Sequence, residues 1–214
     1  HLAWPQDILF LESEGTVLVS NLNSGKITRY NSATGAYQDD FISGLSGPTR
    51  MKIGPDSLLY ILQWNGSGMV KRYQLDGTFV DDFTSVGVNQ SIGLDWDTDT
   101  NLYVSSYNGK SVRKFDVNGQ DLGLFIDTTN LLGPTNIWFD SSGDLLVADY
   151  NGTSVKRFDA NGIFQGDYLT GLGQSEGVAL MADQTILIGN GINGSVKHFA
   201  SNGNFISDLV TPGS

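Results

Sequence analysis

Ser154-Val-Lys-Arg-Phe158 is a short stretch of alternating side chains, and close variants of it occur at four other places in the chain. The apolar second residues of the five copies recur at intervals of about 42 residues. A fixed period of this size indicates a repeat architecture, in which each repeat is one supersecondary unit. The copies are Lys26-Ile-Thr-Arg-Tyr30, Met69-Val-Lys-Arg-Tyr73, Ser111-Val-Arg-Lys-Phe115, Ser154-Val-Lys-Arg-Phe158 and Ser195-Val-Lys-His-Phe199.

Each repeat has the pattern of four short strands, as the fourth copy illustrates. Turns rich in Gly, Asn and Asp separate runs of strand-forming residues at 136–139, 145–148, 154–158 and 163–168. Glycine closes the matching turns of the other copies, because a tight hairpin needs a residue with positive φ. No apolar period of 3.6 residues persists, so we expect essentially no helix.

Four antiparallel strands repeated at this interval form the blades of a β-propeller. The chain resembles the NHL-repeat family of β-propellers over residues 4–210, in the Gly-Pro pairs at 47–48 and 133–134, the string Phe139-Asp-Ser-Ser-Gly-Asp-Leu-Leu-Val-Ala-Asp149 and the Val-Lys-Arg-Phe strand. We therefore predict an all-β fold, a single NHL-like β-propeller over residues 1–214. It has five four-stranded antiparallel blades in a closed ring; the alternative is part of a six-bladed or longer propeller. The predicted blades are residues 4–43, 44–86, 87–130, 131–171 and 172–211.

The composition limits which binding partners and which cellular locations are expected. The 214 residues include 12 Lys and Arg against 23 Asp and Glu, a net charge of −11, which repels phosphate backbones and argues against nucleic-acid binding. There is no cysteine, and no apolar run is long enough for membrane insertion. A start at His1 is consistent with a removed secretion signal, and equally with a trimmed chain or the remnant of a tag. We expect an extracytoplasmic or secreted protein, and the oligomeric state stays open.

The first strand of each blade should line the central channel. Alternation assigns two apolar sets to the packing between sheets: Ile8, Met51, Leu94, Ile137 and Val178, and then Phe10, Ile53, Trp96, Phe139 and Leu180. The residues between them should face the channel, and two Asp–basic pairs among these either neutralise charge in a wet channel or form the floor of a ligand site. The candidate channel residues are Asp7, Arg50, Lys52, Asp95, Asn136, Trp138 and Glu176.

A second candidate site lies where the second strands end. Trp64, Tyr107 and Tyr150 occupy one repeated position at this edge, with polar neighbours. Aromatic rings beside amides and carboxylates suit sugars or peptides, which present apolar faces rimmed by hydrogen-bonding groups. The alternative is that the rings pack against the loop of the next blade. The candidate ligand-binding face is Trp64, Tyr107, Tyr150, Asp149, Asn108 and Asn151.

An enzymatic function is the other alternative. The resemblance extends to propeller lactonases and lyases, and those lyases work with catalytic histidines and a divalent metal. This chain has only the terminal His1 and His198, which stands at a position expected to face solvent, so no catalytic residue is assigned. Calcium takes six to eight oxygen ligands, and Asp7, Asn136 and Glu176 are the weak candidates, with Arg50 opposing a cation there.

The sequence therefore favours a non-catalytic binding or scaffold propeller, without a cofactor, that presents a face to a glycan or a protein or peptide ligand. The alternative is a metal-dependent lactonase-like or lyase-like enzyme with its site at the channel mouth. A third interpretation is that the chain is a purely structural module of a larger surface protein.

Overall fold

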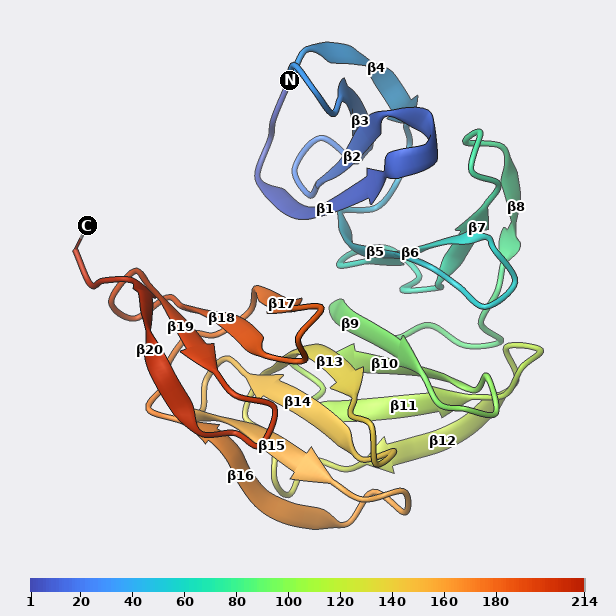
Figure 1. Ribbon diagram of the computed structural model, residues 1–214. Coiled ribbons are helices and arrows are strands. Elements are labelled where there is room, and N and C mark those ends of the chain that lie inside the picture. The colour runs from blue at the N-terminus through green and yellow to red at the C-terminus, as the bar shows by residue number, and fades with distance from the viewer. Residues whose placement is uncertain (214) are drawn as a thin grey trace.

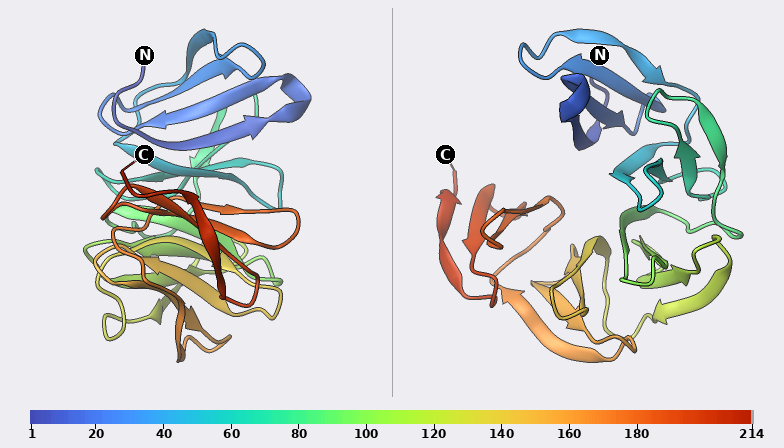
Figure 2. Two further views of the ribbon diagram at one scale, coloured as in Figure 1. Left: turned by 60° about the vertical axis from the view of Figure 1, so that its left-hand side comes forward. Right: turned by 45° about the vertical axis from the view of Figure 1, so that its right-hand side comes forward.

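The computed structural model describes residues 1–213, whose regular secondary structure is almost entirely strand, as predicted. Five four-stranded antiparallel sheets follow one another along the chain, each with its strands in chain order (Figure 1). Figure 2 shows the sheets arranged around a central axis. The fold is thus a five-bladed β-propeller, as the repeat predicted, but the prediction of a closed ring was wrong, because the first and last blades lie apart.

Each sheet corresponds to one copy of the repeat. The first two blades contain β1 (Pro5–Leu11), β2 (Thr16–Asn21), β3 (Lys26–Asn31) and β4 (Tyr37–Ile42), then β5 (Pro48–Ile53), β6 (Leu59–Gln63), β7 (Lys71–Tyr73) and β8 (Phe79–Asp82). The third and fourth contain β9 (Ser91–Trp96), β10 (Leu102–Ser106), β11 (Ser111–Phe115) and β12 (Asp121–Ile126), then β13 (Pro134–Phe139), β14 (Leu145–Asp149), β15 (Ser154–Phe158) and β16 (Phe164–Thr170). The fifth contains β17 (Val178–Leu180), β18 (Ile186–Asn190), β19 (Ser195–Phe199) and β20 (Phe205–Val210).

One short 3-10 turn, η1 (Glu12–Glu14), joins β1 to β2. Within residues 1–213 no helix has the length and apolar character needed to cross a membrane.

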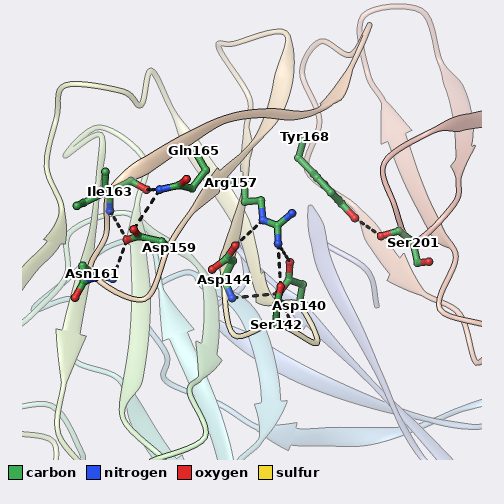
Figure 3. Close-up of polar contacts among 10 residues, drawn as sticks. All are labelled: Asp140, Ser142, Asp144, Arg157, Asp159, Asn161, Ile163, Gln165, Tyr168 and Ser201. Atoms are coloured by element: carbon green, nitrogen blue, oxygen red, sulfur yellow. Dashed lines mark hydrogen bonds and ion pairs between the residues drawn. The ribbon is translucent and has the colours of Figure 1, made fainter.

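The basic and the apolar residues of the repeated third strand have different roles. Its arginine reaches outward to carboxylates, as Arg157 does on β15: Nε is 2.7 Å from Asp144 Oδ2 and Nη2 is 3.1 Å from Asp140 Oδ2 (Figure 3). The following turn is fixed by Asp159, whose Oδ1 accepts the backbone N–H of Asn161 at 2.9 Å. This is the Asx-turn chemistry that makes Asp and Asn frequent before glycine.

The core consists of four apolar clusters, each shared by two consecutive blades. The apolar second residue of the repeat lies in these clusters and is fully buried in the first four blades, at Ile27, Val70, Val112 and Val155. Consecutive blades also exchange polar contacts, such as the bond that the Tyr168 hydroxyl on β16 donates to the carbonyl of Ser201 in the last blade (Figure 3).

Buried hydroxyl groups connect neighbouring blades close to the axis. Thr49 Oγ1 donates to the carbonyl of Ser91 at 2.7 Å, and Thr135 Oγ1 donates to that of Ser175 at 2.9 Å. Ser20 and Ser105, on the second strands, donate in the same way to the carbonyls of Thr49 and Thr135, at 2.5 and 2.7 Å. These bonds satisfy polar backbone atoms that the packing removes from water.

One face of the first blade and one face of the last blade are not covered by a neighbouring blade. Figure 2 shows these two sheets apart on one side of the ring. On β1, Ile8 and Phe10 are both 59% exposed, and in the last blade Val196 is only half-buried, whereas its counterparts in the other blades are fully buried. The expectation that both apolar sets pack between sheets was therefore wrong for Ile8 and Phe10, which have no blade on that side. It was also wrong for Ile53 and Leu180, which are 37% and 56% exposed although a preceding blade is present. It holds for Met51, Leu94 and Ile137, whose blades have a neighbour on that side.

Candidate functional site

A pocket of about 390 Å³ opens on the face of the propeller where the second strands end. Its apolar wall is aromatic: Trp64 follows β6, Tyr107 follows β10, Tyr150 follows β14, and Trp4 precedes β1. The ring centroids of Trp64 and Tyr107 are 5.6 Å apart, and those of Tyr107 and Tyr150 are 5.9 Å apart. The structure thus brings the three predicted aromatics into one patch and adds Trp4.

Tyr107 also contacts the loop of the next blade, as the alternative interpretation expected. Asn151 Nδ2 donates to the Tyr107 hydroxyl at 3.1 Å and to the carbonyl of Leu132 at 3.2 Å. Gly133 lies directly beneath, where a Cβ atom would be 2.6 Å from Asn151 Nδ2 and 3.0 Å from the Tyr107 ring. Glycine at this position therefore allows the loop and the ring to approach each other.

The rest of the pocket wall comes mainly from the first strands and the segments before them. Gln6, Ile92, Thr135 and Glu176 line it, and Gln6 and Thr135 directly precede the predicted channel residues Asp7 and Asn136. The register of the first strand shifts between Pro5 and Asp7 and between Pro134 and Ile137. Such a bulge adds a residue and breaks the alternation of faces, so two consecutive residues can point to the axis. Of this group only Glu176 was a predicted site residue.

Glu176 differs in its surroundings from most other carboxylates of the protein. Its side chain is half-buried, and no Lys or Arg nitrogen within the described residues forms a salt bridge with it. Burial raises the pKa of this carboxyl, Arg50 lowers it and Asp7 raises it further. Within residues 1–213, the pocket therefore contains a carboxyl group that forms no salt bridge.

The predicted channel charges form two close pairs that join blades. Arg50 Nη1 is 2.9 Å from Asp7 Oδ1, and Asp7 Oδ2 accepts the backbone N–H of Met51 at 2.8 Å. Lys52 Nζ is 2.6 Å from Asp95 Oδ1, and the other Asp95 oxygen accepts an N–H from the next blade. Both aspartates thus tie first strands together.

A smaller pocket of about 210 Å³ lies further along the axis. Asn136 and Trp138 line it together with Asp7, Arg50 and Lys52. Trp138 is only 5% exposed and packs in the cluster between the last two blades. Its main role is in the core.

The axial residues do not fit a calcium ion. Both carboxylate oxygens of Asp7 already accept hydrogen bonds, and the Arg50 guanidinium occupies the space beside them. Within residues 1–213 no three His, Cys, Asp or Glu side chains gather closely enough to hold a metal ion. Calcium needs several free oxygen ligands around one point, which Asp7, Asn136 and Glu176 do not provide.

The interpretation of Asp149 as a ligand-face residue is contradicted. It is 1% exposed, and its carboxylate accepts the N–H of Leu132 at 3.0 Å and that of Gly133 at 2.6 Å. The residue at this position holds the segment before the first strand in three other blades as well. Asn21 accepts the backbone N–H of Ala3, Gln63 accepts that of Ser46, and Asn190 accepts that of Gly173. Asn108 is exposed and does not line the pocket.

His198 also differs from its expected solvent-facing position. It is half-buried, and its Nε2 atom is buried without a hydrogen-bond partner. It pairs in register with Leu187 on β18 and Ser207 on β20, in the outer part of the last blade. It does not line the pocket.

Comparison with known proteins supports the fold but does not establish a family or a function. No protein-family model and no curated protein sequence matches the chain. Among solved structures, a gluconolactonase from Xanthomonas campestris has a TM-score of 0.79 at 15% identity, over 100% of this chain and 78% of that one. A catalytically inactive virginiamycin B lyase from Staphylococcus aureus, solved with quinupristin, has a TM-score of 0.72 at 13% identity, over 98% and 71%. A nidogen/laminin complex has a TM-score of 0.76 at 15% identity, over 97% and 80%.

These similar structures are propellers of enzymes and of a protein complex, so one architecture serves several activities. At 13 to 17% identity they establish the β-propeller fold. The resemblance to NHL repeats is not tested by them and stays a prediction.

Proposed function

We propose that the protein is a ligand-binding propeller whose site is the aromatic pocket, and that it takes a glycan or a peptide segment of another protein. The observation that supports this proposal is the convergence of Trp4, Trp64, Tyr107 and Tyr150 with a few polar groups around about 390 Å³. Pockets of this size, mostly apolar with a small number of polar groups, are typical of sites for small organic ligands.

The surroundings of the pocket support a ligand of limited size that is not a nucleic acid. The net charge of −11 opposes a polyanion. Gln6 and Asn23 place amide groups along the pocket wall, where they can bond to sugar hydroxyls or to a peptide backbone. An extracytoplasmic location and kinship with NHL-repeat proteins are part of this proposal.

An enzyme of the lactonase or lyase type is the second candidate, and the names of the similar structures favour it over the binding function. The specific observation in its favour is Glu176, a carboxyl group with a raised pKa inside a pocket. Such a group can exchange a proton with a bound substrate. Because the axial residues do not fit a metal ion, this candidate relies on Glu176 rather than on calcium.

The binding function is tested by screening glycan and peptide arrays with the protein and its Trp64→Ala and Tyr107→Ala variants. We expect binding that falls by at least about ten-fold in both variants, since buried aromatic contacts dominate such sites. Phe79→Ala removes an aromatic residue that is 51% exposed outside the pocket and serves as the matched control. Binding that survives both pocket substitutions would place the ligand elsewhere.

The enzymatic candidate is tested by following acid release from gluconolactone. Hydrolysis above the spontaneous rate that is lost in Glu176→Gln and retained in Glu12→Gln supports it. Equal rates with and without protein speak against this substrate class.

A further inference from the structure

Among the described residues 1–213, Glu176 is the only charged one that lines the aromatic pocket. The other lining side chains are neutral, so no Lys or Arg of the pocket compensates the carboxylate. Arg50, the basic residue whose charge acts on Glu176, is already bonded to Asp7 at 2.9 Å. The ionised pocket therefore carries an unbalanced negative charge.

The aromatic rings of the pocket differ in one respect from many others in the molecule. Outside the pocket, rings are repeatedly covered by a cation of the protein itself, as in Arg29 over Phe41, Lys52 over Trp96, Lys71 over Phe79, Lys156 over Phe164 and Lys197 over Phe205. Within the described residues, no such cation covers Trp4, Trp64, Tyr107 or Tyr150. No cation of the described residues therefore competes with an external one for these rings.

We propose that the ligand of this pocket carries an ammonium group, which binds among the aromatic rings with the Glu176 carboxylate as its counter-ion. The inference rests on the proposed function, because it presupposes that the pocket is a ligand site. A ring face attracts a cation through its quadrupole, and aromatic cages bind quaternary ammonium groups in this way. The carboxylate adds charge complementarity, which excludes anionic ligands.

The ammonium group has two sources among the ligands proposed above. It is either a small amine or the amino group of a peptide, at a lysine side chain or a free N-terminus. A neutral glycan lacks it, so the inference favours amines and peptides over neutral sugars.

The experiment compares choline with 3,3-dimethyl-1-butanol, its uncharged analogue of nearly equal shape, by titration calorimetry with the full chain. We expect choline to bind about ten-fold more tightly, because the analogue lacks the charge. Glu176→Gln should abolish this preference. Glu12→Gln removes the same charge from an exposed turn and should retain it.

The pH dependence gives a second measurement without a substitution. The affinity for choline should rise as pH increases through the pKa of Glu176, which burial raises, since only the ionised form attracts the cation. The other charged groups that act on Glu176 are Asp7 on β1 and Arg50 on β5. They form a close pair with each other. The affinity for the uncharged analogue should not change with pH.

The following outcomes decide between these possibilities. Equal affinity for the two probes, or a preference that survives Glu176→Gln, overturns the ammonium inference. Binding of neutral glycans with no binding of choline or of lysine peptides overturns it too, while the proposed binding function stands. If choline binds and its affinity does not fall in Tyr107→Ala, the pocket is not the site and both proposals fail. A lysine peptide that binds where choline does not, with the same loss in Glu176→Gln, supports the inference and identifies the source as a peptide.

Discussion

Ile8 and Ile137 occupy the same position in the first strands of two blades, yet Ile8 is 59% exposed and Ile137 is 1% exposed. The difference arises because Ile137 faces a preceding blade and Ile8 does not. Identical residues at one repeat position therefore contribute very differently to stability.

Replacement of the two isoleucines by serine tests this difference. Ile137→Ser removes a buried side chain and leaves a hydroxyl in an apolar cluster, so it should lower the free energy of unfolding by about 3 kcal/mol. Ile8→Ser should change it by less than about 0.5 kcal/mol. Urea denaturation measures both. Equal losses would mean that the exposed face of the first blade is covered in solution.

Asp149 should tolerate asparagine but not alanine. Asparagine occupies this position in the first and last blades and accepts the same kind of backbone bond. Asp149→Ala leaves the N–H groups of Leu132 and Gly133 without their partner, so we expect a loss of about 1 to 3 kcal/mol. Chemical denaturation of the two variants at one pH provides the comparison.

The effect of Asp149→Asn on the free energy of unfolding should depend on pH in a definite direction. Burial raises the pKa of Asp149, and the N–H groups of Gly133 and Leu132 lower it in part. An acid whose pKa is raised on folding binds more protons in the folded state, so its contribution to stability is lost as pH rises through the folded pKa. The free energy of unfolding of Asp149→Asn, relative to the natural protein, should increase over that range. A constant difference across the acid range would contradict the raised pKa.

Arg50→Gln should destabilise the protein more than Lys52→Gln. The Arg50 and Asp7 side chains are 14% and 13% exposed, whereas Lys52 is 43% exposed. Removing one partner of a largely buried pair leaves an uncompensated charge and should cost about 3 kcal/mol. A more exposed pair contributes about 1 kcal/mol or less. Thermal unfolding of both variants measures the difference.

Arg50→Gln should also change the titration of Glu176. Arg50 lowers the pKa of Glu176, so its removal should raise this pKa further. Carboxyl NMR shifts followed against pH report it directly. An unchanged value would mean that the two groups do not interact in solution.

Gly133→Ala should disturb the aromatic pocket without a positive-φ penalty. The new Cβ atom would be 2.6 Å from Asn151 Nδ2 and 3.0 Å from the Tyr107 ring, so both side chains must shift. Gly177→Ala, where nothing lies within 4 Å of a Cβ atom, is the control. We expect altered ring NMR signals of Tyr107 in the first variant only.

The fold could be predicted because its evidence is repeated. Alternation in Ser154–Phe158 and its siblings defined the strands, and the constant interval defined the blades. The aromatic patch was predictable for the same reason, since Trp64, Tyr107 and Tyr150 share one repeat position. Trp4 was missed because it precedes the first copy and has no sibling.

The polar floor of the pocket was harder to predict, for a physical reason. A bulge near the start of the first strand breaks the two-residue alternation, so Thr135 and Gln6 face the pocket beside the residues that alternation selected. The role of Asp149 depends on how close the loop at 132–133 comes, which alternation does not encode. The pair of proline and preceding glycine in two blades was the only local signal near this bulge.

The open faces of the first and last blades also affect how the molecule comes apart. Interior blades are held from two sides and terminal blades from one, so the propeller resembles a short one-dimensional stack in which nearest neighbours supply the cohesion. Opening should therefore start at both ends and proceed inward, and amide protons of β10 and β11 should exchange with solvent most slowly. Trp64, Tyr107 and Tyr150 come from the three interior blades, so most of the aromatic wall lies in the part of the stack that opens last.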